Sequence, residues 1–509
     1  MVARTHSVAL MGMTGSMVEV EADIGNGLPT LMIIGLPDTA LSDSRDRVRS
    51  AASNSGCPLP TAKITVNLSP AALPKHGSTF DLGVAMSILA AAGMISPESI
   101  ESVVHLGELS LDGRLRPMSG VLPAITAASR SGFRTFVVPA GNRREAELVP
   151  GVVIVPVVSM RDAAIYHGGA FEPIDREAIE ASGAPEIHEP SQELADVVGN
   201  PDAVSALLAA AAGGHHLFLL GPPGAGKTML ASRLSGLLPD LSTEAALDVT
   251  AVRSLSGASV PQKLATRPPF ESPHHTATAA ALIGGGARQI RPGAAARASS
   301  GVLFLDEAPE FAANVLDCLR QPLESGVISI HRANAIARFP GRFQLVLAAN
   351  PCPCGQYGAQ DANCTCTPNT RRRYLARLSG PLLDRIDIQV HVRRVTAAEL
   401  RLSGDEPRLT TAQARSQVAE ARLRMSERLS CTPWKVNNEV SGSWLRSGPK
   451  KLPLDSLSAL DRALERGGIT MRGYDRVLRV AWTLADLDGL DQPGPVHIGR
   501  ALYLRRSDS

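Results

Sequence analysis

The stretch HHLFLLGPPGAGKTMLASRLSGLL (215–238) decides the fold at the centre of this 509-residue chain. An apolar run precedes a glycine-rich turn and an amphipathic run follows it, which predicts a strand, a loop and a helix of an α/β domain. The turn fits the spacing G-x-x-x-x-G-K-[ST]. Its glycines let backbone N–H groups surround phosphate oxygens, and the positive end of the helix favours the anion. The predicted nucleotide-binding residues are Gly221, Pro222, Pro223, Gly224, Ala225, Gly226, Lys227 and Thr228.

Two side-chain sets complete the predicted ATP site. Lys227 would reach the β- and γ-phosphates, and the hydroxyl of Thr228 would ligate Mg²⁺. GVLFLDEAPEF (301–311) reads as a buried parallel strand that ends at the phosphate edge of the sheet. There, Asp306 would hold Mg²⁺ and Glu307 would polarise the attacking water.

Three more residues are candidates for catalytic work. FQLVLAANPCPCG predicts a buried strand that ends in Asn350, whose amide would orient the water and sense the γ-phosphate. Arg385, in LSGPLLDRIDIQVHV, stands just before another strand, and Arg472 begins a helix in GGITMRGYDRVLRVAWTLADLDG. An arginine keeps its charge and neutralises a transition-state phosphate. Structural ion pairs are the alternative for both arginines.

Four of the seven cysteines form a cluster with the spacing C-x-C-x₉-C-x-C: Cys352, Cys354, Cys364 and Cys366. Four thiolates on a turn-rich loop fit a tetrahedral site for a soft metal, which is most often Zn²⁺. Four protein thiolates leave no open coordination position, so we expect a structural metal that braces one edge of the ATPase site. An iron–sulfur cluster and a loop of reduced thiols are the alternatives.

The remaining pattern divides the chain into an α/β domain (1–170), an acidic linker (171–195), a nucleotide-binding core (196–395) and a helical domain (396–509). Within the first domain the pattern predicts strands at 30–37, 62–70, 135–140 and 151–157, and helices at 38–56 and 80–93.

Composition predicts a cytoplasmic protein without a membrane span. Hydrophobic residues make up 44% and charged residues 20%, and no secretory signal or long apolar segment is evident. The charge is uneven, because residues 201–509 carry 37 Lys and Arg against 27 Asp and Glu. We therefore expect this part to contact a polyanion; a solvated basic surface is the alternative.

The order of these motifs resembles that of AAA+ ATPases. More narrowly, PFESPHHTATAAALIGGGARQIRPG, GVLFLDEAPEF, LAANPCPCG and LSGPLLDRIDI resemble the YifB/ComM family of magnesium-chelatase-like AAA+ proteins. The resemblance covers essentially the whole chain. It implies a homo-oligomeric ring, expected to be a hexamer, in which Arg385 acts on a neighbour's ATP and Arg472 is the second sensor. It also implies a helix insert (255–300) and a pre-sensor hairpin (327–340), both facing the pore.

Residues 1–170 resemble the Lon-type protease domain, an α/β domain of the ribosomal S5 domain 2-like fold. The family's serine nucleophile follows a Pro-Lys-x-Gly turn, which is residues 74–77 here, and Thr79 falls nearest to it. The family's lysine base is replaced by Leu122. Because a hydroxyl without a base is a poor nucleophile, we expect a non-proteolytic domain used for binding or oligomerisation.

The resemblance points to DNA as the object of the motor, in branch migration or helicase-type translocation during recombination or transformation. Basic residues of the insert and hairpin support this, because they neutralise phosphates without reading bases. They are Lys263, Arg267, Arg288, Arg291 and Arg297 in the insert, and Arg332 and Arg338 in the hairpin. A magnesium-chelatase-type motor subunit and an ATP-dependent regulatory or chaperone assembly are the competing functions.

Overall fold

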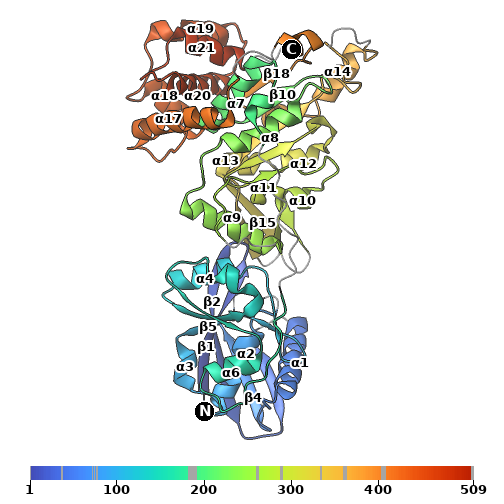
Figure 1. The fold of residues 1–509 in the computed structure, drawn as a ribbon, viewed down its shortest axis with the longest axis vertical. Helices are drawn as coiled ribbons and strands as arrows, with labels where there is room; N and C mark the ends of the chain where they lie inside the picture. The colour runs from blue at the N-terminus through green and yellow to red at the C-terminus, as the bar shows by residue number, and fades with distance from the viewer. Residues whose placement is uncertain are drawn as a thin grey trace.

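The computed structural model describes residues 2–35, 38–71, 73, 75, 78–180, 192–258, 263–286, 290–332, 335–358, 364–402 and 408–505. Figure 1 shows an elongated molecule. A sheet built from the N-terminal residues lies at one end, a second sheet lies in the middle, and the C-terminal helices gather at the other end. The fold is mixed α/β with a helical C-terminal region.

The N-terminal part is a seven-stranded mixed sheet in the order β3-β4-β2-β1-β5-β8-β9. Its centre is a long antiparallel hairpin of β1 and β2, while β5, β8 and β9 run parallel. The strands are β1 (Val2–Met11), β2 (Thr14–Gly25), β3 (Thr30–Ile34), β4 (Lys63–Ser69), β5 (Val103–His105), β8 (Thr135–Pro139) and β9 (Val153–Val157).

Helices cover this sheet. All residues of α2 are buried, as its nearly uninterrupted apolar run predicts. The helices are α1 (Asp38–Asn54), α2 (Asp81–Ala91), α3 (Pro97–Glu101), α4 (Val121–Arg130), α5 (Arg143–Ala146) and α6 (Met160–Tyr166), and a short ribbon pairs β6 (Glu108–Leu109) with β7 (Leu115–Arg116). The segment after α6 contains a 3-10 turn at Leu194–Asp196, and residues 181–191 of the expected linker lie outside the described residues.

The central sheet is parallel, in the order β11-β14-β17-β10-β18. Both faces of β14 and β17 are buried, which explains why β14 is apolar throughout and β17 is apolar from Leu345 onward. The carboxyl ends of β10, β14 and β17 therefore meet at one edge. The strands are β10 (Leu217–Leu220), β11 (Phe270–Glu271), β14 (Val302–Leu305), β17 (Gln344–Ala349) and β18 (Ile388–His391), packed on α7 (Pro201–Gly213) and α8 (Lys227–Leu237). Buried residues of α9 (Thr243–Ser256) share an apolar cluster with β10, β14 and β17.

Part of the expected insert (255–300) belongs to the nucleotide-binding core, because β11 lies within it and forms the edge strand of the central sheet. The expected hairpin is an antiparallel pair. The insert contains α10 (Ala279–Ile283), β12 (Gly284–Gly285), β13 (Arg291–Pro292) and α11 (Ala294–Arg297); the hairpin is β15 (Val327–Arg332) with β16 (Ala335–Pro340), preceded by α12 (Ala313–Asp317) and α13 (Arg320–Ser325).

The C-terminal part is helical, and α20 is its central member. Buried residues of α20 share one hydrophobic cluster with the strands of the nucleotide-binding sheet. A buried hydrogen bond of 2.7 Å joins His215, just before β10, to Thr483 of α20. The helices are α14 (Pro368–Leu375), α15 (Gly380–Leu383), α16 (Ala397–Leu402), α17 (Thr411–Leu429), α18 (Gly442–Ser447), α19 (Leu454–Glu465), α20 (Met471–Leu487) and α21 (Pro495–Tyr503). Among the described helices, none is both long and apolar enough to cross a membrane.

The turn of the β1–β2 hairpin joins the first sheet to the β15–β16 hairpin. The backbone N–H of Met13 donates to the carbonyl of Arg338 over 3.1 Å, and Gly12 lies directly beside that residue. A Cβ at Gly12 would be 2.7 Å from the Arg338 carbonyl oxygen, so the close approach requires glycine. Nearby, Ser254 of α9 accepts from the N–H of Gly120 over 2.8 Å and donates to the buried carboxylate of Glu145.

Candidate active site: a phosphate loop beside a four-cysteine cluster

The loop between β10 and α8 has the geometry of a phosphate-binding turn. Gly226 has φ +90°, a left-handed conformation that favours glycine, and places the N-terminus of α8 at the loop. Lys227 is the first residue of α8. Its Nζ donates to the carbonyl of Gly221 over 2.7 Å and to the Oδ1 of Asn350 over 3.0 Å. Burial lowers the pKa of Lys227, and the carboxylates of Asp306 and Glu307 oppose that effect.

The structure brings the predicted magnesium ligands together. The hydroxyl of Thr228 donates to Oδ2 of Asp306 over 2.6 Å, from the first turn of α8 to the end of β14. A hydroxyl and a carboxylate oxygen at this separation suit Mg²⁺, which prefers hard oxygen ligands. Glu307 follows in a left-handed conformation, with φ +49°. Its side chain is half-exposed at the same edge of the sheet.

The strand that carries Asn350 lies between the two strands of the phosphate site. β17 pairs with β10 on one side and with β14 on the other. Asn350 follows its last residue, so its amide reaches Lys227 across the sheet edge. The residues predicted to bind the phosphates, hold the metal ion and orient water thus form one cluster.

Two residues at this site were not predicted. His275 lies between β11 and α10, and its Nδ1 is 3.2 Å from Oε2 of Glu307. Arg394, which follows β18, donates through Nε to the carbonyl of Pro223 over 2.9 Å. The sequence signal for His275 is the histidine pair in SPHHTAT, which lies within one of the stretches that resemble YifB/ComM proteins.

The two candidate arginines lie together, and within the described residues their polar partners belong to the region of α13 and α15. Arg385 pairs with Glu324 and donates to the carbonyl of Pro381. Arg472, largely exposed at the start of α20, pairs with Asp384 over 3.2 Å. Arg472 thus contacts the residue that precedes Arg385 in the chain, and the side chain of Arg385 itself is largely buried.

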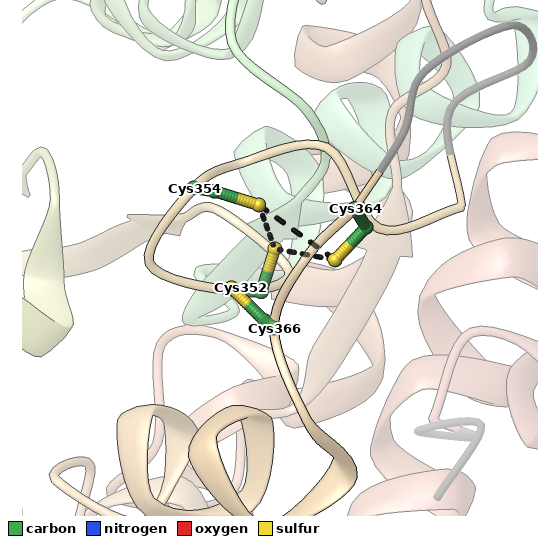
Figure 2. Close-up of side chains that lie close together, drawn as sticks. All are labelled: Cys352, Cys354, Cys364 and Cys366. Atoms are coloured by element: carbon green, nitrogen blue, oxygen red, sulfur yellow. Dashed lines mark hydrogen bonds between the residues drawn. The ribbon is translucent and has the colours of Figure 1, made fainter.

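The four cysteines of the cluster converge, as Figure 2 shows. Their sulfur atoms all lie within 4.8 Å of one another, and three of the separations are 3.3, 3.6 and 3.8 Å. A tetrahedral site with Zn–S bonds of about 2.3 Å has sulfur atoms about 3.8 Å apart. A disulfide would need about 2.05 Å. The arrangement therefore fits a four-thiolate metal site.

The cysteine loop packs directly on the phosphate loop. Cys352 is buried two residues after Asn350, and its carbonyl accepts from the N–H of Gly355 over 2.9 Å. Gly355 has φ +73°, and a Cβ there would be 2.5 Å from the ring of Pro223. A hydrogen bond from the backbone of Gln356, assisted by Cys352, lowers the pKa of the Cys354 thiol to about 6, toward the thiolate that binds metal.

The basic residues of the insert and hairpin differ in their surroundings. Arg297 pairs with Glu271 over 2.9 Å and stabilises the insert, so it is not a free phosphate contact. Arg267 lies 3.8 Å from Asp240. Arg332 and Arg338 expose their side chains, and a guanidinium N–H of Arg332 donates to the carbonyl of Gly286. Arg288 lies outside the described residues.

At the protease-like positions of the N-terminal part, Leu122 is fully buried, and its backbone N–H donates to Glu145 over 2.9 Å. Thr79 lies next to Ser78, whose hydroxyl donates to Glu108. Burial raises the pKa of nearby Asp81 to about 6, although Arg47 and Ser44 stabilise its charged form. Lys75 is buried with its Nζ on the carbonyl of Pro70 at 2.6 Å; Pro74, His76 and Gly77 lie outside the described residues.

A parallel sheet with a phosphate loop, an acidic strand end and a polar residue on the strand between them defines the AAA+ class of ATPases. The family description "Magnesium chelatase, subunit ChlI" matches residues 193–400. "Subunit ChlI of Mg-chelatase" matches residues 20–142, and its C-terminal counterpart matches residues 408–505.

Relatives that match over their full length identify the family within this class. An uncharacterised protein of Mycobacterium tuberculosis is 47% identical over 99% of this chain and 98% of its own length. Competence protein ComM of Haemophilus influenzae is 40% identical and YifB of Escherichia coli 39%, each over 99% of this chain and 97% of the relative. The chain belongs to the YifB/ComM family of magnesium-chelatase-like AAA+ proteins. A Lon protease of Mycolicibacterium smegmatis is 30% identical over 33% of the chain and 22% of the protease.

Proposed function

We propose that this protein is an ATP-hydrolysing ring motor that acts on DNA, by branch migration or helicase-type translocation. The observation that carries the ATPase is the cluster of Lys227, Thr228, Asp306, Glu307 and Asn350 at one edge of a parallel sheet. Three other observations support DNA as the molecule on which the motor acts. They are an exposed basic hairpin, the net positive charge of residues 201–509, and a full-length relative whose name is "competence protein".

Each residue of the site has a distinct task in this proposal. Backbone N–H groups of residues 221–228 and the N-terminus of α8 bind the phosphates, and Lys227 turns its Nζ to the β- and γ-phosphates. Thr228 and Asp306 hold Mg²⁺, which supplies neutralising charge when bound. Glu307 accepts the proton of the attacking water, and Asn350 orients that water.

The polar contacts of the two arginines support a ring. Arg385 and Arg472 pair with Glu324 and Asp384, away from the contacts of the phosphate loop. We propose that Arg385 completes the ATP site of an adjacent subunit in a homo-oligomeric ring, a hexamer by family, and that Arg472 is the second sensor. We also propose a cytoplasmic location, which the seven unpaired cysteines support.

For DNA, we expect the hairpin to contact phosphates without reading bases. The Arg332→Ala/Arg338→Ala variant should bind DNA more weakly, and its plot of log affinity against log salt should be shallower by up to about two units. The backbone contact between Arg338 and Met13 survives this change. The measurement is a salt titration of binding to forked and linear duplexes, together with ATP turnover at each DNA concentration.

The control is Arg462→Ala/Arg466→Ala, which removes the same charge from exposed positions in and just after α19. It should keep the wild-type salt slope. An unchanged slope in the hairpin variant would remove the hairpin from the DNA path. A wild-type protein whose turnover does not respond to DNA would favour the metal-insertion motor that the chelatase family description suggests.

At the cysteine cluster we propose one structural Zn²⁺ per chain. The Cys364→Ser/Cys366→Ser variant should lose the metal, because two of four thiolates are gone, and should melt at a lower temperature. The ATP affinity of this variant should also fall, because the cysteine loop packs on Pro223 of the phosphate loop. Elemental analysis of protein purified without chelator measures the metal.

Cys318→Ser/Cys431→Ser is the matched control, since both of those cysteines are exposed and outside the cluster. It should retain the wild-type metal content and melting temperature. Wild-type protein without bound metal would reject the zinc site, and bound iron in place of zinc would identify the iron–sulfur alternative.

A further inference from the structure

Arginines of the C-terminal helices bind the chain on both sides of Arg385. We call residues 384–387, with the sequence DRID, the Arg385 segment. Each of its other three residues accepts a contact from one of these arginines, through a carboxylate or a backbone carbonyl. The three arginines are Arg472 and Arg476 of α20 and Arg505, which follows α21. The position of the Arg385 segment therefore depends on the C-terminal helices of the same chain.

The last residue of the segment, Asp387, is a fully buried anchor. Its carboxylate accepts from the backbone N–H of His216, just before β10, over 3.1 Å and pairs with Arg476 over 2.5 Å. Burial would raise the pKa of Asp387, but Arg476 holds it well below its usual range. A buried ion pair that is broken leaves an uncompensated charge in the interior. Asp387 therefore fixes α20 against the central sheet.

Arg505 holds the peptide unit that directly follows Arg385. Its guanidinium donates to the carbonyl of Ile386 over 2.6 Å and lies 3.8 Å from the carboxylate of Asp384, and its side chain is only 12% exposed. The planar guanidinium has donors in a fixed arrangement, so it holds two acceptors with little loss of freedom. The carbonyl of Leu504 accepts from the N–H of Gln389 in β18 over 2.6 Å. The end of α21 is thus joined both to the Arg385 segment and to the strand after it.

We propose that Arg505 is a positioning residue for Arg385, so that the C-terminal helices of one subunit affect ATP hydrolysis in its neighbour. The inference rests on the proposed function, in which Arg385 completes the ATP site of an adjacent subunit. An arginine stabilises a transition-state phosphate only when its guanidinium is placed accurately. Arg505 fixes the backbone from which the side chain of Arg385 extends, and it does so from the interior of the subunit.

The test measures steady-state turnover and equilibrium ATP binding of Arg505→Ala. Its kcat should fall by about 10- to 100-fold, because a displacement of about 1 Å at a catalytic group has an effect of this order. ATP affinity should remain at the wild-type value, since the described contacts of Arg505 lie outside the phosphate loop. Arg505→Lys keeps a donor for the carbonyl of Ile386 and should recover most of the kcat. The control is Arg500→Ala, which removes a cation of α21 that pairs with Asp488 and should keep the wild-type kcat.

Two comparisons distinguish positioning of Arg385 from a general structural role. Arg505→Ala/Arg385→Ala should turn over at the rate of Arg385→Ala, because the effect of Arg505 passes through Arg385. Arg505→Ala subunits mixed with Lys227→Ala subunits should regain turnover, since the former supply an intact phosphate loop and the latter a correctly placed Arg385. Arg505→Ala mixed with Arg385→Ala should regain none, because both changes affect the same half of the shared site.

Three results would contradict the proposal. A wild-type kcat in Arg505→Ala, or a double variant slower than Arg385→Ala, would overturn it. If Arg385→Ala subunits recover with Lys227→Ala subunits and Arg505→Ala subunits do not, the ring stands and the positioning role of Arg505 is rejected. If Arg385→Ala alone keeps the wild-type turnover, the proposed function of Arg385 fails, and the positioning role fails with it.

Discussion

Replacing Glu307 by glutamine is expected to lower kcat for ATP hydrolysis by at least about 100-fold, which is what a general base contributes at its lower bound. ATP affinity should be retained, because Thr228 and Asp306 remain to hold Mg²⁺ and Lys227 remains at the phosphates. Equilibrium binding of ATP and steady-state turnover, measured on the same preparation, separate the two effects.

Two other variants serve as comparisons for Glu307→Gln. Lys227→Ala removes the cation of the phosphate loop and should lose nucleotide binding together with turnover. Glu310→Gln makes the same chemical change three residues away, at a side chain that pairs with Arg377 over 3.1 Å, and should retain turnover. A Glu307→Gln protein that turns over at the wild-type rate would remove Glu307 from the catalytic role.

Arg385→Ala is expected to reduce turnover by about 10³-fold or more, since an arginine finger contributes that much to phosphoryl transfer. In the proposed ring, the target of Arg385 is the ATP of an adjacent subunit. Mixing inactive Arg385→Ala and inactive Lys227→Ala subunits should therefore restore activity. In random 1:1 rings, about a quarter of the sites combine an intact phosphate loop with an intact finger.

The control mixture combines Lys227→Ala with Glu307→Gln. Both changes affect the same subunit's half of the site, so no arrangement of these subunits creates an intact site. Recovery in the first mixture alone supports action between subunits. Failure to recover at every ratio, in rings demonstrated to contain both variants, would contradict it and favour a structural ion pair for Arg385.

The nucleotide motif was predictable because its chemistry restricts residue types at fixed spacing. A loop that binds phosphate requires glycine at Gly226, and a buried strand requires the apolar run before Asp306. From these features the sequence located strand ends that the structure then brings together at one edge. The predicted strands and helices of residues 1–170 are likewise present, with boundaries shorter by one to a few residues.

Contacts between distant segments could not be predicted. Nothing local to SPHHTAT indicates that His275 reaches Glu307, because this contact depends on the pairing of β11 with β14. The proximity of Gly355 to Pro223 likewise depends on the order of strands in the sheet. The β1–β2 hairpin was missed although it forms the centre of the first sheet: polar residues such as Thr5 and Ser7, buried here, interrupt its apolar pattern.

The bond between Met13 and Arg338 means that the N-terminal part and the basic hairpin share a mechanical joint. The apolar cluster that contains Ile328 and Phe339 of the hairpin also includes Leu10, Met11 and Met13. Apolar packing and a backbone hydrogen bond therefore both hold this joint. A force on the hairpin would therefore also act on the first sheet through these contacts. In the proposed ring, the N-terminal parts would form a second layer that is mechanically coupled to the hairpins. A chain that begins at residue 196 would lack this coupling, so its hairpin would be less restrained.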